Sequence, residues 1–222
     1  MIPIAKKISN AKGGPNPPSL HQEYKEFIVD NEHPCIMANA VFTLNNFELK
    51  QFDKLASKNT AVEILSELKT YLANYDFDKN KFKSFIAAFP QTQVHSEEEL
   101  QYIHEIDEQP WDSNVSSDPQ NANFSFSIAG HAFYVVGMHP HSSRLARRSP
   151  YPTLVFNLHS QFEKLREMKA FHKVRNKIRE RDIAFQGDIN PVLKDYGDSS
   201  EAIQYSGRNI DGNWKCPFHS KS

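Results

Sequence analysis

The sequence predicts an α+β fold, in which helices pack against a mostly antiparallel sheet within a single domain. Two patterns carry this prediction: amphipathic stretches that begin with capping residues, and short apolar or alternating stretches between them. With 222 residues, 39% of them hydrophobic, the chain is long enough to bury one substantial core. We divide it into an extended N-terminal arm at residues 1–18, which holds two glycines and four prolines, and one domain at residues 19–222.

Four stretches have the capping residues and the apolar spacing of helices. The caps and the apolar positions after them are Ser19 before Leu20, Tyr24, Phe27 and Ile28; Thr60 with Glu63 before Ile64, Leu65, Leu68, Leu72 and Tyr75; Ser96 with Glu99 before Leu100, Ile103 and Ile106; and Ser160 with Glu163 before Phe162, Leu165, Met168, Phe171, Val174 and Ile178. The last helix is predicted to be the longest. We interpret its basic residues, at 164–181, as a solvated face.

The strands are expected between these helices. FKSFIAAF (82–89) is short and apolar, and TLVFNLH (153–159) has the composition of a buried strand. NFSFSIAG alternates strictly and is followed by HAFYVVGM, so residues 123–138 predict a hairpin that turns at Gly130. WDSNVSSDPQNA (111–122) is expected to be an exposed loop.

Composition and missing motifs exclude several functional classes. A formal net charge of -1 indicates no general attraction to nucleic acid or membranes. The N-terminus lacks the apolar core of a signal peptide, and no stretch approaches the length of a membrane span. We therefore expect a cytoplasmic protein with reduced thiols at Cys35 and Cys216. The signatures of P-loop, dinucleotide-binding, nucleophile-elbow, zincin and c-type haem proteins are absent.

The candidate site is the segment GMHPHSSRLARRSPYP, residues 137–152, which holds two histidines, three arginines and three prolines. Imidazole is a ligand for haem iron and zinc, so His139 and His141 could bind a metal, although isolated histidine pairs are more often exposed or hydrogen-bonded. Cys35 and Cys216 each adjoin a proline and could present a thiolate. The more common interpretation of such residues is a small buried thiol.

Several stretches resemble the YqcI/YcgG family over most of the chain, at residues 30–218. They are the PC pair near the start, FYVVGMHPHSSRLARRSPYPTLVFNLHSQFEKLRE, IRERD and SEAIQYSGRNIDGNWKCPF. Members of that family with a known role are haem-dependent N-hydroxylases of guanidine groups. The resemblance implies a monooxygenase that uses haem b, O2 and electrons from a separate reductase to hydroxylate a small guanidine or a related amine. The alternative is a haem sensor or carrier without turnover, and a weaker one is a non-haem metal on the histidines.

The resemblance also implies which residues hold the cofactor. His139 is the expected axial ligand of the iron, and His159 is the second choice. The remaining cofactor-binding candidates are the expected partners of the haem propionates, Arg144, Arg147 and Arg148. Ligation by a thiolate stays open as an alternative to histidine, whereas His33 and His131 rank low.

A guanidinium substrate would need an acidic partner in the pocket. We expect that partner within residues 97–118 or in the loop from Asp195 to Glu201. The sequence does not indicate which carboxylate it is.

Overall fold

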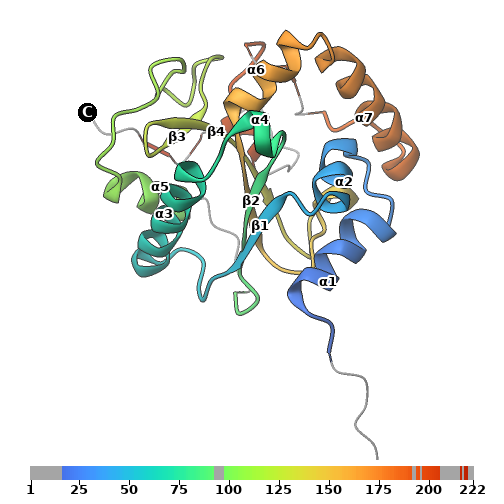
Figure 1. Ribbon diagram of the computed structural model, residues 1–222, viewed down its shortest axis with the longest axis horizontal. Coiled ribbons are helices and arrows are strands. Elements are labelled where there is room, and N and C mark those ends of the chain that lie inside the picture. The colour runs from blue at the N-terminus through green and yellow to red at the C-terminus, as the bar shows by residue number, and fades with distance from the viewer. Residues whose placement is uncertain are drawn as a thin grey trace, which may run out of the picture.

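In this computed structural model, the described part of the chain comprises residues 17–92, 98–191, 194–195, 197–205, 216 and 218–219. The predicted arm, apart from its last two residues, lies outside these ranges, as does the Ser96 cap. Helices cover both faces of a central sheet, and the elements form one compact body, which confirms the predicted α+β class (Figure 1).

The sheet has five strands in the order β1-β2-β5-β4-β3. Their bounds are Phe47–Gln51 for β1, Ser84–Ala88 for β2, Phe126–Ile128 for β3, His131–Met138 for β4 and Thr153–Leu158 for β5. β1 runs parallel to β2, and the other pairs are antiparallel, so the sheet is mostly antiparallel as predicted. The predicted hairpin corresponds to β3 and β4. β1 was not predicted, because FELKQ is polar enough for an edge strand that is only half buried.

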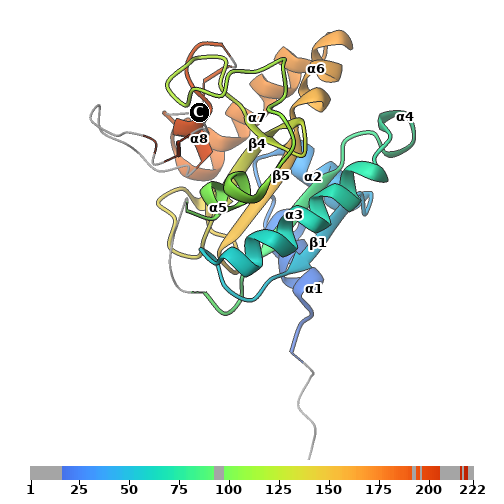
Figure 2. The same cartoon turned by 90° about the vertical axis from the view of Figure 1, so that its left-hand side faces the viewer.

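Helices form two layers, one on each face of the sheet (Figures 1 and 2). α3 (Lys58–Ala73) and α5 (Glu98–Ile106) cover one face. α1 (Leu20–Lys25), which continues as a π-helical segment at Glu26–Asp30, and α2 (Ile36–Thr43) cover the other face together with α6 (His159–Glu167) and α7 (Phe171–Gln186). Two short helices, α4 (Phe77–Asn80) and α8 (Ala202–Tyr205), and a 3-10 turn at Leu145–Arg147 complete the described elements.

The two faces of the sheet are packed differently. Side chains that alternate along the central strands, among them Phe85, Phe133, Val135 and Phe156, are fully buried in the core beneath α3 and α5. Because successive residues of a strand point to opposite faces, their neighbours Ile86, Tyr134, Val136 and Val155 face the other layer. Tyr134, Val136 and Val155 there are only half buried. This second face borders the candidate site.

Two of the predicted helix starts are wrong. α3 begins after Ser57, and Thr60 is buried inside the helix, at 3% exposure, instead of capping it. The helix predicted to be capped by Ser160 starts at His159 and has Leu158 as its N-cap, so Ser160 lies inside it. The apolar spacing therefore located these helices correctly but not their first residues.

The long helix predicted from Ser160 is two helices. α6 ends in a Schellman motif, in which Ala170 N–H donates to Leu165 O at 3.1 Å and Lys169 N–H donates to Arg166 O at 2.8 Å. Lys169 takes the left-handed conformation, with φ 54°, that glycine usually supplies at this position. Met168, expected on the apolar face, is 61% exposed. No helix in the described ranges has both the length and the apolar character needed to cross a membrane.

Candidate functional site

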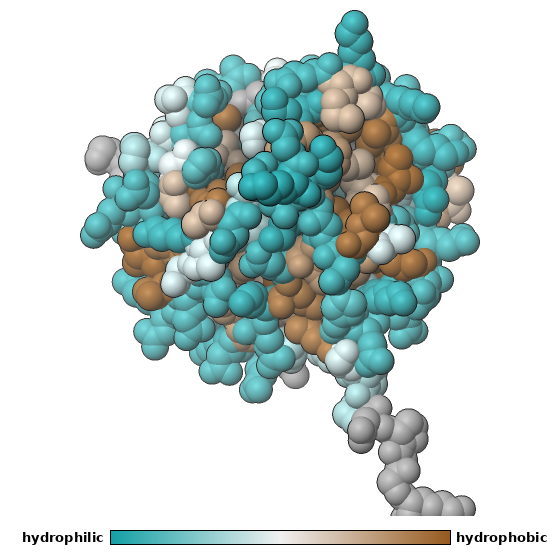
Figure 3. Space-filling model, in the orientation of Figure 1, coloured by the Kyte–Doolittle hydropathy of each residue, from teal (hydrophilic) through white to brown (hydrophobic). Residues whose placement is uncertain are grey.

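A cavity of about 350 Å³ lies between the second face of the sheet and the helices that cover it. Its walls are largely apolar. The apolar lining residues include Ile28, Val41, Phe42, Ile86, Val136, Met138, Val155, Phe162, Leu165, Phe171, Val174 and Ile178. Apolar side chains also reach the surface in the region of α2 and α7, on the right of Figure 3. A cavity of this size and character is typical of a small-molecule site.

The polar lining of the cavity carries more cations than carboxylates. The cations are Arg144, Arg147, Arg166, Arg175, Arg179 and Lys194, and the carboxylates are Asp182, Asp195 and Glu201. Positive charge enclosed by apolar walls is costly unless it is paired. The lining therefore favours a ligand that is apolar over most of its surface and carries negative charge.

Arg147 is a cation of the lining that is bound by backbone carbonyls and not by a carboxylate. Its guanidinium donates to three backbone carbonyls: Gly137 O at 3.0 Å, Tyr205 O at 3.3 Å and Gln204 O at 3.4 Å. No carboxylate of the described ranges lies within ion-pair distance of it. Burial lowers the pKa of Arg147, as expected for a guanidinium held away from water.

The segment that contains Cys35 is held firmly at the edge of the same cavity. Cys35 is the N-cap residue of α2, and its Sγ accepts the N–H of Ala38 at 3.5 Å. The Asn39 side chain donates to His33 O at 2.7 Å and to Cys35 O at 3.0 Å, while Arg181 donates to His33 O at 3.1 Å. Burial raises the pKa of the Cys35 thiol, and the nearby backbone N–H groups and Arg147 act in the opposite direction.

His33 lines the cavity, but both of its ring nitrogens are engaged by backbone. Nδ1 accepts the N–H of Cys35 at 3.2 Å, so Nε2 carries the proton and donates to Ala146 O at 2.8 Å. Burial lowers the pKa of His33 to about 4, which keeps the ring neutral near neutral pH. His33 thus ties the Cys35 segment to the loop of Arg147.

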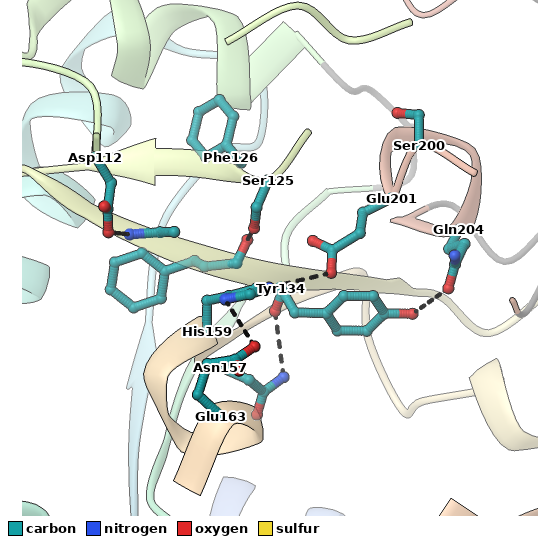
Figure 4. Close-up of polar contacts among 12 residues, drawn as sticks. Asp112, Ser125, Phe126, Tyr134, Asn157, His159, Glu163, Ser200, Glu201 and Gln204 are labelled. Atoms are coloured by element: carbon teal, nitrogen blue, oxygen red, sulfur yellow. Dashed lines mark hydrogen bonds and ion pairs between the residues drawn. The ribbon is translucent and has the colours of Figure 1, made fainter. Parts of the chain in front are cut away.

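His159 lies between two carboxylates in the cavity wall (Figure 4). Nδ1 is 4.0 Å from Glu163 Oε1, and Nε2 is 3.8 Å from Glu201 Oε1. Burial lowers the pKa of His159, whereas burial raises the pKa of Glu201 to about 8. At neutral pH the two groups are therefore a neutral imidazole beside a carboxyl group that is largely protonated.

Arg144 holds the loop to α7 at the rim of the cavity. Its guanidinium donates to Asp182 Oδ2 at 2.7 Å, to the Asp188 carboxylate and to Asp188 O at 3.0 Å. It is 4% exposed. Because Arg144 is already paired with two carboxylates, its role is to position the loop.

The interpretation of the helix at 164–181 as a solvated basic face is only partly right. Arg166, Arg175 and Arg179 line the cavity, and both Arg175 and Arg179 pair with Asp195. Lys164 and Lys177 do form exposed ion pairs with glutamates one turn away.

The structure brings some of the predicted site residues together and leaves others outside. Arg144, Arg147 and His159 line the cavity. His139 does not: it follows β4, its backbone N–H donates to Arg147 O at 2.9 Å, and its Nδ1 accepts the N–H of His141 at 3.0 Å. Arg148 is exposed and donates to Ser142 O at 2.8 Å, so it too lies outside the cavity lining.

Sequence reasoning left the acidic residue of the pocket unassigned and gave Tyr134 no role. Of the two acidic ranges considered, the Asp195–Glu201 loop is the one that reaches the cavity, through Asp195 and Glu201. Tyr134 was treated as one residue of an apolar strand. The period-2 pattern of β4 places it on the cavity face with Val136 and Met138, and could have identified it.

Comparison with known proteins gives one family. The sequence profile described as "YqcI/YcgG family" matches residues 24–219. An "Uncharacterized protein YqcI" of Bacillus subtilis (strain 168) is 27% identical over 212 residues, which cover 85% of this chain and 81% of the relative. No solved structure matches the chain.

The two carboxylates bound to Arg144 allow a matched test of its anchoring role. Asp182→Ala should lower the free energy of unfolding by about 3–5 kcal/mol, because it leaves a buried guanidinium partly uncompensated. Asp188→Ala should cost less than about 1 kcal/mol, because the Asp188 side chain is 68% exposed. Urea denaturation of the two variants measures this difference. An equal decrease in the free energy of unfolding in both variants would show that Asp182 is not the main partner that anchors Arg144.

Proposed function

The chain belongs to the YqcI/YcgG family, and we propose that it binds haem b in this cavity and uses it to hydroxylate a guanidine nitrogen. One observation carries the proposal. A cysteine thiol held at the start of a helix lines an apolar cavity whose cations outnumber its carboxylates. Haem requires an axial ligand, apolar walls and cationic partners for two propionates, and the residues present fit each requirement.

Cys35 replaces His139 as the proposed axial ligand, because Cys35 lines the cavity and His139 does not. Thiolates are stabilised by helix N-termini and by nearby cations, and Cys35 has both in the N–H of Ala38 and the guanidinium of Arg147. A coordinated metal deprotonates a thiol outright, so the raised pKa of the free thiol does not oppose this role. His159 is then left to act on the substrate side.

Arg147 is the proposed partner of a propionate. A carboxylate beside it would supply the counter-charge that no acidic side chain of the described ranges provides at ion-pair distance. Arg166 and Arg179 are further cationic groups of the lining.

The reaction inserts one oxygen atom of O2 into an N–H bond and reduces the other to water with two electrons and two protons. Bound haem supplies the activation of O2, and a thiolate ligand favours cleavage of the O–O bond. The apolar walls contributed by α2, α7 and the sheet exclude bulk water. The electrons come from a separate reductase. The cytoplasm, where thiols stay reduced, suits a free Cys35.

Haem titration tests the axial ligand. Wild-type protein should bind haemin, and its ferrous carbon monoxide complex should show the red-shifted Soret band of thiolate ligation. Cys35→Ala should lose that band. Cys216→Ala and His139→Ala should keep it, since neither side chain lines the cavity. If His139→Ala loses haem binding while Cys35→Ala keeps the wild-type spectrum, the histidine assignment is restored. Failure of the wild-type protein to bind haemin would refute the haem proposal.

Haem affinities of variants at two neighbouring arginines test the proposed propionate site. Removing one charge-assisted hydrogen bond costs about 1.5–3 kcal/mol, so Arg147→Gln should weaken haem binding roughly tenfold to a hundredfold. Arg148→Gln makes the same change in charge one residue away, at an exposed position outside the cavity, and should have no effect. Thermal melting of both variants checks that they are folded. Equal haem affinities in the two variants would contradict the assignment.

Turnover is the test of the activity itself. Haem-loaded protein with a reductase system, O2 and arginine should form a hydroxylated guanidine, with one O2 consumed per product. Carbon monoxide should abolish the product because it occupies ferrous haem. If haem is bound but a panel of guanidines and amines yields no hydroxylated product, the chain is a haem-binding protein without this activity.

A further inference from the structure

Glu201 is a buried carboxyl group in the cavity wall, directly before α8. It is 4% exposed, and it reaches from the turn before that helix toward Tyr134 and His159 (Figure 4). Its Oε2 accepts a hydrogen bond from Tyr205 Oη at 3.4 Å, and its Oε1 is 3.8 Å from His159 Nε2. Within the described ranges, no lysine or arginine lies within ion-pair distance of it.

The neighbours of Glu201 do not neutralise a carboxylate. Burial lowers the pKa of His159, so the imidazole is uncharged near neutral pH. Arg166 on α6 acts on Glu201 only weakly compared with burial, and its guanidinium is bound by Glu163. Burial without a cation therefore keeps Glu201 largely protonated at neutral pH, and a ligand that brings a positive charge stabilises its carboxylate form.

Aromatic rings surround the same part of the cavity. Tyr134 makes edge contacts with Phe162 at 5.8 Å and with Tyr205 at 5.9 Å between ring centroids, and His159 lies 6.5 Å from Phe162. Tyr134 and Phe162 both line the cavity. Aromatic faces attract cations, and a planar guanidinium can stack on a ring while it donates two parallel hydrogen bonds to one carboxylate.

We propose that Glu201, together with the rings of Tyr134 and Phe162, forms a subsite that binds the guanidinium group of the substrate. This inference rests on the proposed function and adds to it the residue that selects the substrate. Glu201 is paired bidentately with the guanidinium, and the rings limit the bound group to a planar cation. His159, neutral and beside the same carboxylate, holds an imidazole nitrogen near the bound group.

Binding at this subsite is linked to the proton of Glu201. The pKa of the free carboxyl is raised to about 8 by burial, so a cation that requires the carboxylate displaces a proton below that pH. Affinity for a guanidinium should therefore fall by about tenfold per pH unit between pH 7 and pH 6. The other groups that face Glu201 are His159, Glu163 and Arg166 on α6, Tyr134 on β4, Ser125 and Tyr205. Burial raises the pKa values of Tyr134 and Tyr205 further above this range and lowers the pKa of His159.

Calorimetric titration with three amino acids tests the subsite. Arginine carries a guanidinium, citrulline carries a neutral urea of the same shape, and lysine carries an ammonium. Arginine should bind at least about tenfold more tightly than either of the others. Tighter binding of lysine, or equal binding of arginine and citrulline, would overturn the guanidinium assignment.

Two matched variants locate the charge. Glu201→Gln should weaken arginine binding by at least about tenfold, leave citrulline binding unchanged and abolish the pH dependence. Glu163→Gln removes the carboxylate on the other side of His159. Because the Glu163 side chain is 50% exposed, this substitution should leave arginine binding unchanged. Melting curves confirm folding of both variants. Unchanged arginine affinity in Glu201→Gln would overturn the proposal.

The same titrations with haem-free and haem-loaded protein separate this inference from the proposed function. Glu201→Gln should bind haemin with the Soret band of the wild-type protein. If haemin does not bind but Glu201-dependent arginine binding persists, the haem proposal fails and the subsite stands. If haemin binds but arginine and citrulline are not distinguished, the subsite fails alone.

Discussion

The site depends on the hydrogen bonds that the guanidinium of Arg147 donates to backbone carbonyls. This guanidinium joins the end of β4, through Gly137 O, to α8, through the carbonyls of Gln204 and Tyr205. The backbone carbonyl of Arg147 also accepts the N–H of His139, which fixes the turn after β4. The turn after β4 and α8, which are far apart in sequence, thus meet at one half-buried cation, and that cation lacks a carboxylate partner among the described residues.

The division of the sheet into two faces explains why an open cavity exists in a well-packed fold. α3 and α5 seal one face with a dense aromatic core that includes Phe85 and Phe156. On the other face, a smaller apolar cluster that includes Tyr24 and Phe42 packs the covering helices, and polar links add to it, among them Arg144 to Asp182 and His33 to Ala146 O. The first face supplies most of the hydrophobic stabilisation, so the second can remain partly unfilled and serve a ligand.

Local patterns predicted the fold better than they predicted the site. Alternation and turn residues were enough to identify the β3–β4 hairpin and the central strands, because those signals depend only on neighbouring residues. The break after α6 was missed because Lys169 occupies a position at which glycine would have signalled a helix end. β1 was missed because its half-buried edge position tolerates polar residues.

The site shows the limit of local patterns more sharply. The crowding of histidines and arginines at 137–152 directed attention to a loop that lines the cavity through Arg144 and Arg147. His139 was favoured as a ligand because it lies in the same segment, yet it ends outside the cavity, while Cys35 enters it from a helix about a hundred residues earlier in the chain. Which of these residues reaches the cavity depends on tertiary packing, and the sequence of a single segment does not reveal that packing.

The most direct test of the haem assignment is the position of the iron. Crystals of the haem-loaded protein, measured at the iron absorption edge, give an anomalous difference peak that locates the metal without assumptions about its ligands. The account predicts one peak inside the cavity, at bonding distance from Cys35 Sγ. A peak beside His139, a peak elsewhere on the molecule, or crystals of haemin-treated protein without any iron peak would contradict it.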